Sequence, residues 1–140
     1  MIVLDTNVVS ELMRPNPSSR VMDWVAGQSV PRLYLSTVSE AELRYGVEFL
    51  PPGKRRTQLL DQIEGMLSED FAGRILPFDR AAAQAYAVIA AARRAAGRPI
   101  NHADCQIAAI AGCRGASVAT RDAAGFEGSG IDVIDPWTDR

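Results

Sequence analysis

Short apolar runs alternate with longer helix-forming stretches along all 140 residues of this chain. The runs expected to form strands are 2–4, 33–36, 74–77, 117–120 and 131–134. The stretches expected to form helices are 6–13, 18–27, 38–49, 54–69, 79–96 and 102–113, with a short turn or helix before the last strand. Strands separated by helices favour a parallel sheet covered on both faces. The sequence therefore predicts a single α/β domain over residues 1–140.

Residue types at two helix ends sharpen this prediction. Asp79 is a suitable N-cap for the helix over 79–96, and Gly97 suits its C-terminal end. The segment Thr37-Val38-Ser39-Glu40 fits a capping box, with Thr37 as the N-cap and Glu40 reaching back to it.

Composition places the chain among ordinary globular proteins, with 47% apolar and 23% charged residues. No apolar run approaches the roughly 20 residues that span a bilayer, and Met1 leads into a strand rather than a secretion signal. Cys105 and Cys113 would lie about 12 Å apart on one helix, too far for a disulfide. Free thiols and the lack of a signal predict a cytoplasmic protein without a membrane partner.

The charge balance leaves the partner class open. The net charge is −2, whereas nucleic-acid-binding proteins are more often basic. Fourteen of the fifteen basic residues are arginines, with Lys54 as the single lysine. Arginine suits bidentate phosphate contacts, but a GC-rich genome explains the same bias.

Four acidic residues occupy positions where a carboxylate is awkward for folding: Asp5, Glu42, Asp104 and Asp122. Asp5 and Asp122 follow predicted strands, Glu42 lies within a predicted helix, and Asp104 opens another. Ligands of parallel sheets gather beyond the carboxyl ends of the strands. We therefore expect at least two of these acids at one functional edge.

Glu42 is expected to point inward. On a helical wheel it groups with large apolar residues, namely Val38, Tyr45 and Phe49. An inward carboxylate needs a partner or a proton. An ion pair with a buried arginine is the alternative to a functional role.

Each remaining acid also has an ordinary structural explanation. Asp5 can end a strand or cap the following helix, and Asp122 fits an Asp-containing turn. Asp104 follows Asn101 in a capping arrangement, although it shares a helix face with the apolar residue Ile107. These explanations stay open for each residue taken alone.

Taken together, the four acids indicate a site for a hard divalent cation. Clustered carboxylates repel one another unless they are neutralised, and such cations prefer oxygen ligands. A zinc site is excluded because His102 is the only histidine and the spacing of the two cysteines is wrong. No phosphate-binding glycine loop and no Ser-His-Asp arrangement is evident.

Four segments in order resemble the PIN-domain family: Leu4-Asp5-Thr6-Asn7, Ala41-Glu42-Leu43-Arg44-Tyr45-Gly46, Ala103-Asp104 and Thr120-Arg121-Asp122. The nearest branch resembles the VapC toxins of bacterial toxin–antitoxin pairs, in particular the FitB-like members. The segment from Phe71 to Asp79 is similar to that subgroup. The resemblance covers essentially the whole chain, and all four acidic positions are filled.

This resemblance implies a central parallel sheet of about five strands flanked by helices. It also implies an acidic pocket that binds Mg²⁺ or Mn²⁺ and an endoribonuclease acting on structured RNA such as tRNA or rRNA. A small DNA-binding antitoxin would inhibit the enzyme through a groove near the site. The toxin would form a homodimer within a larger toxin–antitoxin complex.

We assign provisional roles to the site residues on this basis. Asp5 and Asp104 are expected to be direct metal ligands, and Asp122 a ligand directly or through water. Glu42 would act through water or orient the attacking water. Three polar residues would fix these carboxylates from behind: Thr6, Asn7 and Thr120.

Two further expectations concern the substrate and the antitoxin. Four arginines near the site in sequence could contact RNA phosphates, or simply be solvated: Arg14, Arg44, Arg98 and Arg121. The helices over 18–27 and 38–49 carry large apolar residues for an antitoxin groove or for ordinary core packing: Val21, Trp24, Val25, Tyr45 and Phe49.

Other classes of function fit less well. A phosphotransferase with a nucleophilic aspartate would carry a second acid where Asn7 stands, and a late lysine as well. A response-regulator receiver fails for lack of the same lysine. The remaining alternative is a catalytically silent PIN-like binding or regulatory scaffold.

Overall fold

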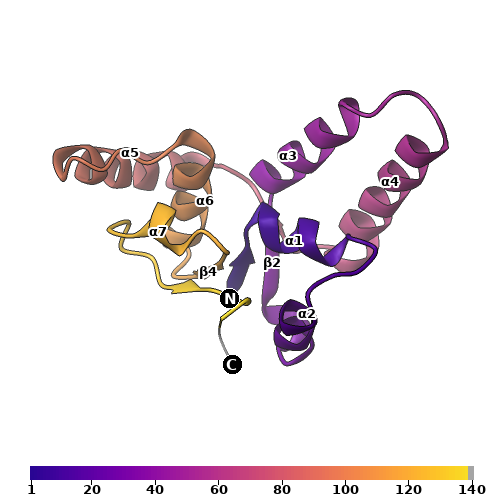
Figure 1. Ribbon diagram of the computed structural model, residues 1–140. Helices are drawn as coiled ribbons and strands as arrows, with labels where there is room; N and C mark the ends of the chain where they lie inside the picture. The colour runs from indigo at the N-terminus through magenta and orange to yellow at the C-terminus, as the bar shows by residue number, and fades with distance from the viewer. Residues whose placement is uncertain (139–140) are drawn as a thin grey trace.

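The structure, a computed structural model, describes residues 1–138 (Figure 1). Its strands are β1 Ile2–Leu4, β2 Leu33–Ser36, β3 Ile75–Leu76, β4 Ser117–Ala119 and β5 Val133–Ile134. Its helices are α1 Thr6–Leu12, α2 Ser19–Ala26, α3 Thr37–Glu48, α4 Lys54–Gly65, α5 Arg80–Ala95, α6 His102–Gly112 and α7 Ala123–Phe126. A 3-10 turn at Val30–Arg32 and a π-helical turn at Met66–Asp70 complete the regular structure. The predicted alternation of strands and helices is confirmed.

The five strands form one parallel sheet in the order β3-β2-β1-β4-β5. The chain first moves outward from β1 to β2 and β3, and then returns to place β4 on the other side of β1. Strand order therefore reverses between β1 and β4, where Leu4 pairs with Ala119. Such a reversal opens a crevice at the carboxyl ends of the two strands.

Helices cover both faces of the sheet, as predicted. Alternate strand residues face opposite sides, so Leu4 packs with the core under α1 to α4, whereas Val3 packs with the core under α5 to α7. Figure 1 shows α3 and α4 projecting to one side of the sheet and α5 with α6 and α7 to the other. The crevice therefore lies between two separately packed groups of helices.

The predicted ends of α5 are confirmed. Asp79 is its N-cap, and its Oδ1 accepts a hydrogen bond from the Ala82 amide at 3.0 Å. Gly97 follows the helix with φ +72°, in the left-handed region that favours glycine.

The predicted capping box of α3 is wrong by one residue. Ser36, the last residue of β2, caps the helix by accepting from the Ser39 amide at 3.1 Å. Thr37 is already helical, and Glu40 pairs with Arg44 at 2.8 Å instead of reaching back. The helix thus starts directly from the strand end, which places Ser39 beneath the first turn of α1.

The helix predicted over 54–69 is also divided. Regular α-helix ends at Gly65, and the π-helical turn continues the chain to Asp70.

Within the described residues, no helix is both long and apolar enough to cross a membrane. Cys105 and Cys113 are both free thiols, as their spacing predicts.

Two glycines give a matched test of the backbone geometry. Gly97→Ala should lower the free energy of unfolding by about 1–2 kcal/mol, because a Cβ is strained at positive φ. Gly65 has helical angles and open space at the Cβ position, so Gly65→Ala should raise the free energy of unfolding by about 0.5–1 kcal/mol. Urea unfolding measures both changes, and a stabilising Gly97→Ala would contradict this description of the α5 terminus.

Candidate active site

The pairing of β1 with β4 brings the first two site residues together. Asp5 follows β1 and Thr120 follows β4, and the Asp5 amide continues the ladder by donating to the Ala119 carbonyl at 2.8 Å. Thr120 Oγ1 donates to Asp5 Oδ2 at 2.7 Å in a buried hydrogen bond. The two residues therefore meet at the crevice between the strands.

Asp5 is held firmly although its side chain is nearly inaccessible. Its exposed fraction is 5%, and its Oδ1 accepts from the Thr6 amide at 2.8 Å at the start of α1. Burial raises the pKa of this carboxyl, and the hydrogen bonds from Thr120 and Thr6 offset part of that rise. The negative charges of Glu42 and Asp122 raise its pKa further.

Asn7 links α1 to the loop after β4. Its Nδ2 donates to Thr120 Oγ1 at 3.2 Å, and its Oδ1 accepts from the Arg121 amide at 3.2 Å. Thr120 Oγ1 also accepts from the Asp122 amide at 3.0 Å. Three polar side chains of the predicted supporting set thus touch Asp5 or its neighbours directly.

The predicted orientation of Glu42 is wrong. The buried side of α3 consists of Ser39, Leu43 and Val47, whereas Glu42 is exposed along with Tyr45. The helical wheel failed because the stripe of smaller residues, rather than the aromatic ones, packs against the core. Both faces were candidates for the buried side, because α3 is apolar on more than one side.

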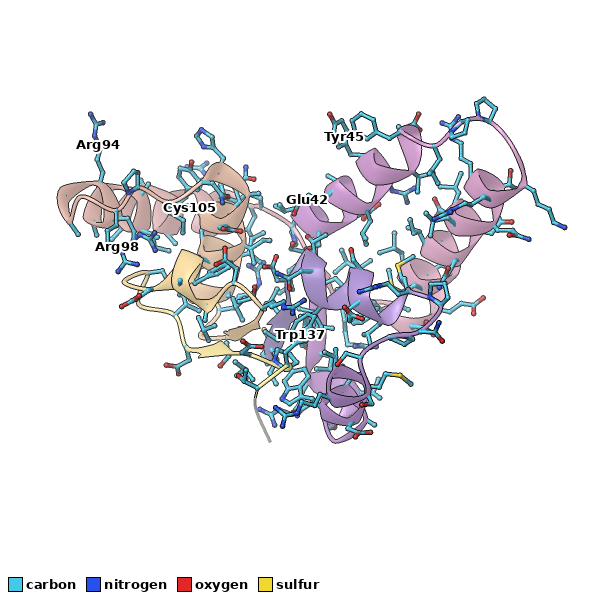
Figure 2. The ribbon with its side chains drawn as sticks, viewed as in Figure 1. Glu42, Tyr45, Arg94, Arg98, Cys105 and Trp137 are labelled. Carbon is cyan, nitrogen blue, oxygen red and sulfur yellow. The ribbon has the colours of Figure 1, made fainter. Side chains whose placement is uncertain are left out.

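Glu42 nevertheless reaches the site from the exposed face. Thr6 Oγ1 lies 2.7 Å from Glu42 Oε1 and 2.9 Å from Ser39 Oγ, so a hydroxyl chain connects α3 to the residue after Asp5. Figure 2 shows Glu42 on the side of α3 that faces the α6 region. The alternative of an ion pair between Glu42 and a buried arginine is not found within residues 1–138.

Asp104 reaches the crevice from the first turn of α6. Asn101 caps this helix, with its Oδ1 accepting from the Asp104 amide and its Nδ2 donating to Asp104 Oδ2, both at 2.8 Å. Burial raises the pKa of the Asp104 carboxyl, and the charges of Asp5 and Asp122 raise it further. The hydrogen bond from Asn101 and the Arg93 charge act in the opposite direction.

Asp122 and Asp104 converge on a glycine. Asp122 caps α7 by accepting from the Gly125 amide at 3.1 Å. A Cβ on Gly125 would lie 2.5 Å from Asp122 Oδ2 and 3.2 Å from Asp104 Oδ2. The two carboxylates are therefore close to one point, and a side chain at position 125 would force the Asp122 carboxylate to shift.

A cavity of about 550 Å³ opens over these groups. Its wall contains three of the four acids and several residues of α1, with the full lining being Asp5, Thr6, Asn7, Ser10, Glu11, Arg14, Glu42, Asp104, Arg121 and Trp137. Asp122 lies beside the cavity rather than in its wall. Three residues of the wall were not predicted from the sequence: Ser10, Glu11 and Trp137. Only the helical spacing from Asn7 to Ser10 and Glu11 could have suggested the first two.

The predicted arginines divide into two groups. Arg14 and Arg121 line the cavity. Arg44 instead pairs with Glu40 and Glu64, and Arg98 pairs with Glu127 at 3.2 Å. Arg44 and Arg98 do not line the cavity.

The four acids differ from other acids in their charge partners. Within residues 1–138, six carboxylates elsewhere form ion pairs with arginine: Glu11, Glu40, Glu48, Glu64, Asp79 and Glu127. Asp5, Glu42, Asp104 and Asp122 have no such pair in the same part of the chain. An all-oxygen donor set without a basic partner fits a hard divalent cation.

The same carboxylates are not drawn together into a closed cage. In the described part of the chain, no three Asp, Glu, His or Cys side chains lie close enough to hold one metal ion. The fit to a metal therefore rests on the chemistry of the oxygen donors and not on a closed ligand cage.

The raised pKa values predict an unusual stability profile for the metal-free protein. A carboxyl whose pKa is higher in the folded state than in the unfolded state binds protons more tightly when folded, so stability falls as pH rises through that window. Unfolding by urea in EDTA should therefore give a lower free energy at pH 8 than at pH 5. Asp104→Asn should reduce this difference, whereas the exposed Asp61→Asn should preserve it. A metal-free protein that is more stable at pH 8 would contradict the site electrostatics.

Comparison with known proteins identifies the family of this chain. The family model described as the PIN domain matches residues 2–127. A VapC ribonuclease, Y4jK, from Sinorhizobium fredii is 47% identical over 137 residues, covering 98% of each chain. Toxin FitB from Neisseria gonorrhoeae is 43% identical over 139 residues, covering 99% of this chain and 100% of FitB.

The three-dimensional fold is equally similar to a solved structure. The crystal structure of FitAcB from Neisseria gonorrhoeae superposes with a TM-score of 0.93 at 43% identity, with 99% of both chains covered. The family match covers most of the chain, and the two relatives align with 98% and 99% of it. The chain therefore belongs to the PIN-domain family, in the VapC group that includes the FitB toxin.

Proposed function

We propose that this protein is the toxin of a toxin–antitoxin pair and a metal-dependent endoribonuclease that hydrolyses structured RNA such as tRNA or rRNA. The observation that supports it best is the set of four carboxylates at the β1–β4 crevice, none of which pairs with a basic residue within residues 1–138. A phosphodiester is anionic, so carboxylates alone would repel it. Such a site becomes useful for RNA when cations enter with the substrate.

Each acid has a role in this proposal. Asp5 and Asp104 would be direct ligands of Mg²⁺ or Mn²⁺, and Asp122 would bind directly or through water. Glu42 would act through water or orient the attacking water, consistent with its position on the exposed face of α3. When bound, the ion would supply the positive charge that neutralises the phosphate and makes water a better nucleophile.

The polar neighbours of Asp5 set its direction. The donors from Thr120 and Thr6 fix both oxygens of its carboxylate, and Asn7 ties the loop after β4 to α1. Loss of a group that orients a ligand in this way typically lowers metal affinity or activity by about 10- to 100-fold. Thr6 has a second role, because its hydroxyl also contacts Glu42.

Arginines on the cavity wall would bind the RNA backbone. Arg14 and Arg121 both line the cavity, at the end of α1 and in the loop after β4. Planar guanidinium groups match phosphate oxygens with two hydrogen bonds. Two such groups could contact phosphates next to the scissile bond.

The antitoxin would occupy a second hollow beside the active site. A groove of about 340 Å³ lies between α1, α3 and α4, and several of its residues are apolar, including Met13, Leu43, Val47, Leu59 and Ile63. Glu42 and Thr6 are part of both hollows. A helical tail of a small DNA-binding antitoxin placed there would reach the acids, in line with the VapC resemblance.

The surface expected from the sequence differs from this groove. Val21 and Trp24 are buried in the core, so ordinary packing explains them. Tyr45 and Phe49 are exposed at 65% and 72% and stack edge to face on the outer side of α3.

We propose that the toxin also forms a homodimer within the larger complex.

Cleavage of RNA by purified, antitoxin-free protein tests the proposed function. We expect the wild-type protein to cut total cellular RNA in Mg²⁺ or Mn²⁺ and not in EDTA, with fragments followed by electrophoresis. Asp5→Asn should lower the rate at least 100-fold while the protein stays folded, because it removes the most buried carboxylate of the site.

Asp61→Asn is the matched control, since Asp61 is exposed on α4 and does not line the cavity. Cleavage that survives Asp5→Asn would contradict the assigned site. Folded wild-type protein that cuts none of bulk RNA, isolated tRNA and rRNA would support a binding or regulatory scaffold instead.

A further inference from the structure

We propose that Trp137 is a positioning residue that holds the Arg121 guanidinium away from the carboxylates of the cavity. The acids then stay open to a divalent cation, and the guanidinium stays open to an RNA phosphate. This inference rests on the proposed ribonuclease function and assigns a role to the segment after β5.

Arg121 is the cavity arginine without a carboxylate partner in the described residues. It stands between Thr120 and Asp122 in the chain, and its amide donates to Asn7, yet its guanidinium forms no ion pair within residues 1–138. Its Cζ instead lies over the Trp137 ring, 5.0 Å from the ring centroid. The side chain is thus directed onto an aromatic face, although four acidic residues line the same cavity.

Arg14 shows the arrangement that simple electrostatics favours. This second cavity arginine pairs with a carboxylate of the same wall, at 3.2 Å from its Nη1 to Glu11 Oε1. Glu11 is itself buried and also accepts from the Ser18 amide. The two arginines line one cavity, but within residues 1–138 only Arg14 of the two forms an ion pair with an acid.

The energies involved make this arrangement attainable. An exposed ion pair contributes about 0–1 kcal/mol, because water screens it and both side chains lose freedom. A cation over a tryptophan face contributes about 0.5–2 kcal/mol, and tryptophan is the best aromatic partner. The indole can therefore compete with nearby carboxylates for the same guanidinium.

Trp137 is fixed well enough to act as such a platform. Its amide donates to Asp135 Oδ1 at 2.9 Å, and its carbonyl accepts from Arg20 Nη1 at 3.0 Å. The ring packs partly against the core cluster that includes Val9 and Trp24. Figure 2 places Trp137 in the segment that follows the sheet, across α1 from Glu42.

Loss of the indole would release Arg121 toward the acids. Its guanidinium is carried by the residue immediately before Asp122, and the cavity wall that it shares with Asp5 and Asp104 is short of positive charge. An arginine paired with these carboxylates would compete with a metal ion for the same oxygens. It would also be withdrawn from the RNA phosphate.

A double-mutant cycle measures this coupling. We would determine the dissociation constant for Mn²⁺ by calorimetry without RNA, and KM for cleavage of a purified RNA, in four proteins: wild type, Trp137→Leu, Arg121→Gln and the double variant. Trp137→Leu should weaken Mn²⁺ binding about 3- to 30-fold and raise KM. In the Arg121→Gln background, the same change should leave Mn²⁺ binding unaltered.

A conservative variant separates positioning from simple support of the fold. Trp137→Phe keeps an aromatic face for Arg121 and should restore most of the Mn²⁺ affinity that Trp137→Leu loses. Thermal unfolding of each variant shows whether the fold itself has changed. A loss of the same size with and without Arg121, or no rescue by phenylalanine in folded protein, would overturn the proposal.

The result also distinguishes this inference from the proposed function. Wild-type protein that binds Mn²⁺ and cleaves RNA, together with a cycle that shows no coupling, would overturn the inference alone. Wild-type protein that neither binds Mn²⁺ nor cleaves RNA would overturn both, since the acids would then have no cation to be kept open for.

Fluorescence gives a readout that is independent of activity. The chain has two tryptophans, and Trp24 is buried in the core, so Trp24→Phe leaves Trp137 as the sole tryptophan. Titration with a short RNA analogue that cannot be hydrolysed, in Mg²⁺, should change its emission as the guanidinium moves toward phosphate. The emission change should disappear in the Arg121→Gln background. An emission change of the same size in that background would contradict the assigned contact.

Discussion

The buried hydrogen bond from Thr120 to Asp5 is the contact on which the rest of this site depends. It exists because β1 and β4 are paired in parallel register, so the residues that follow Leu4 and Ala119 must meet. The strand order reverses at this pair, which leaves their carboxyl ends uncovered by a crossover helix. The site therefore follows from chain topology before any individual side chain is considered.

Stability and function oppose each other at this position. Four carboxylates without basic partners in the described chain raise the free energy of the folded state when they are all charged, whereas six acids elsewhere are neutralised by arginines. The hydroxyl and amide donors around Asp5 reduce that cost without supplying positive charge. The fold thereby keeps the acids oriented while leaving room for a cation to neutralise them.

The helices, the strands and part of the site could be predicted from the sequence, whereas other features of the site could not. Asp5 and Thr120 were predictable because strand ends of a parallel sheet converge, and Asp79 and Gly97 because caps have strong residue preferences. The prediction that Glu42 points inward was wrong, because α3 carries apolar residues on two sides and periodicity alone cannot show which side is buried. Trp137 could not be predicted, because its place at the cavity depends on how the segment after β5 folds back.

Gly125 shows how narrowly the two later acids are accommodated. One methyl group at this position would occupy the space that Asp122 and Asp104 share, although α7 itself would accept alanine readily. A genetic selection for cells that survive production of this protein should thus recover substitutions at Gly125 in full-length, folded chains. Such inactive proteins would keep the groove proposed for the antitoxin, so they could still bind the antitoxin and compete for it with the active toxin.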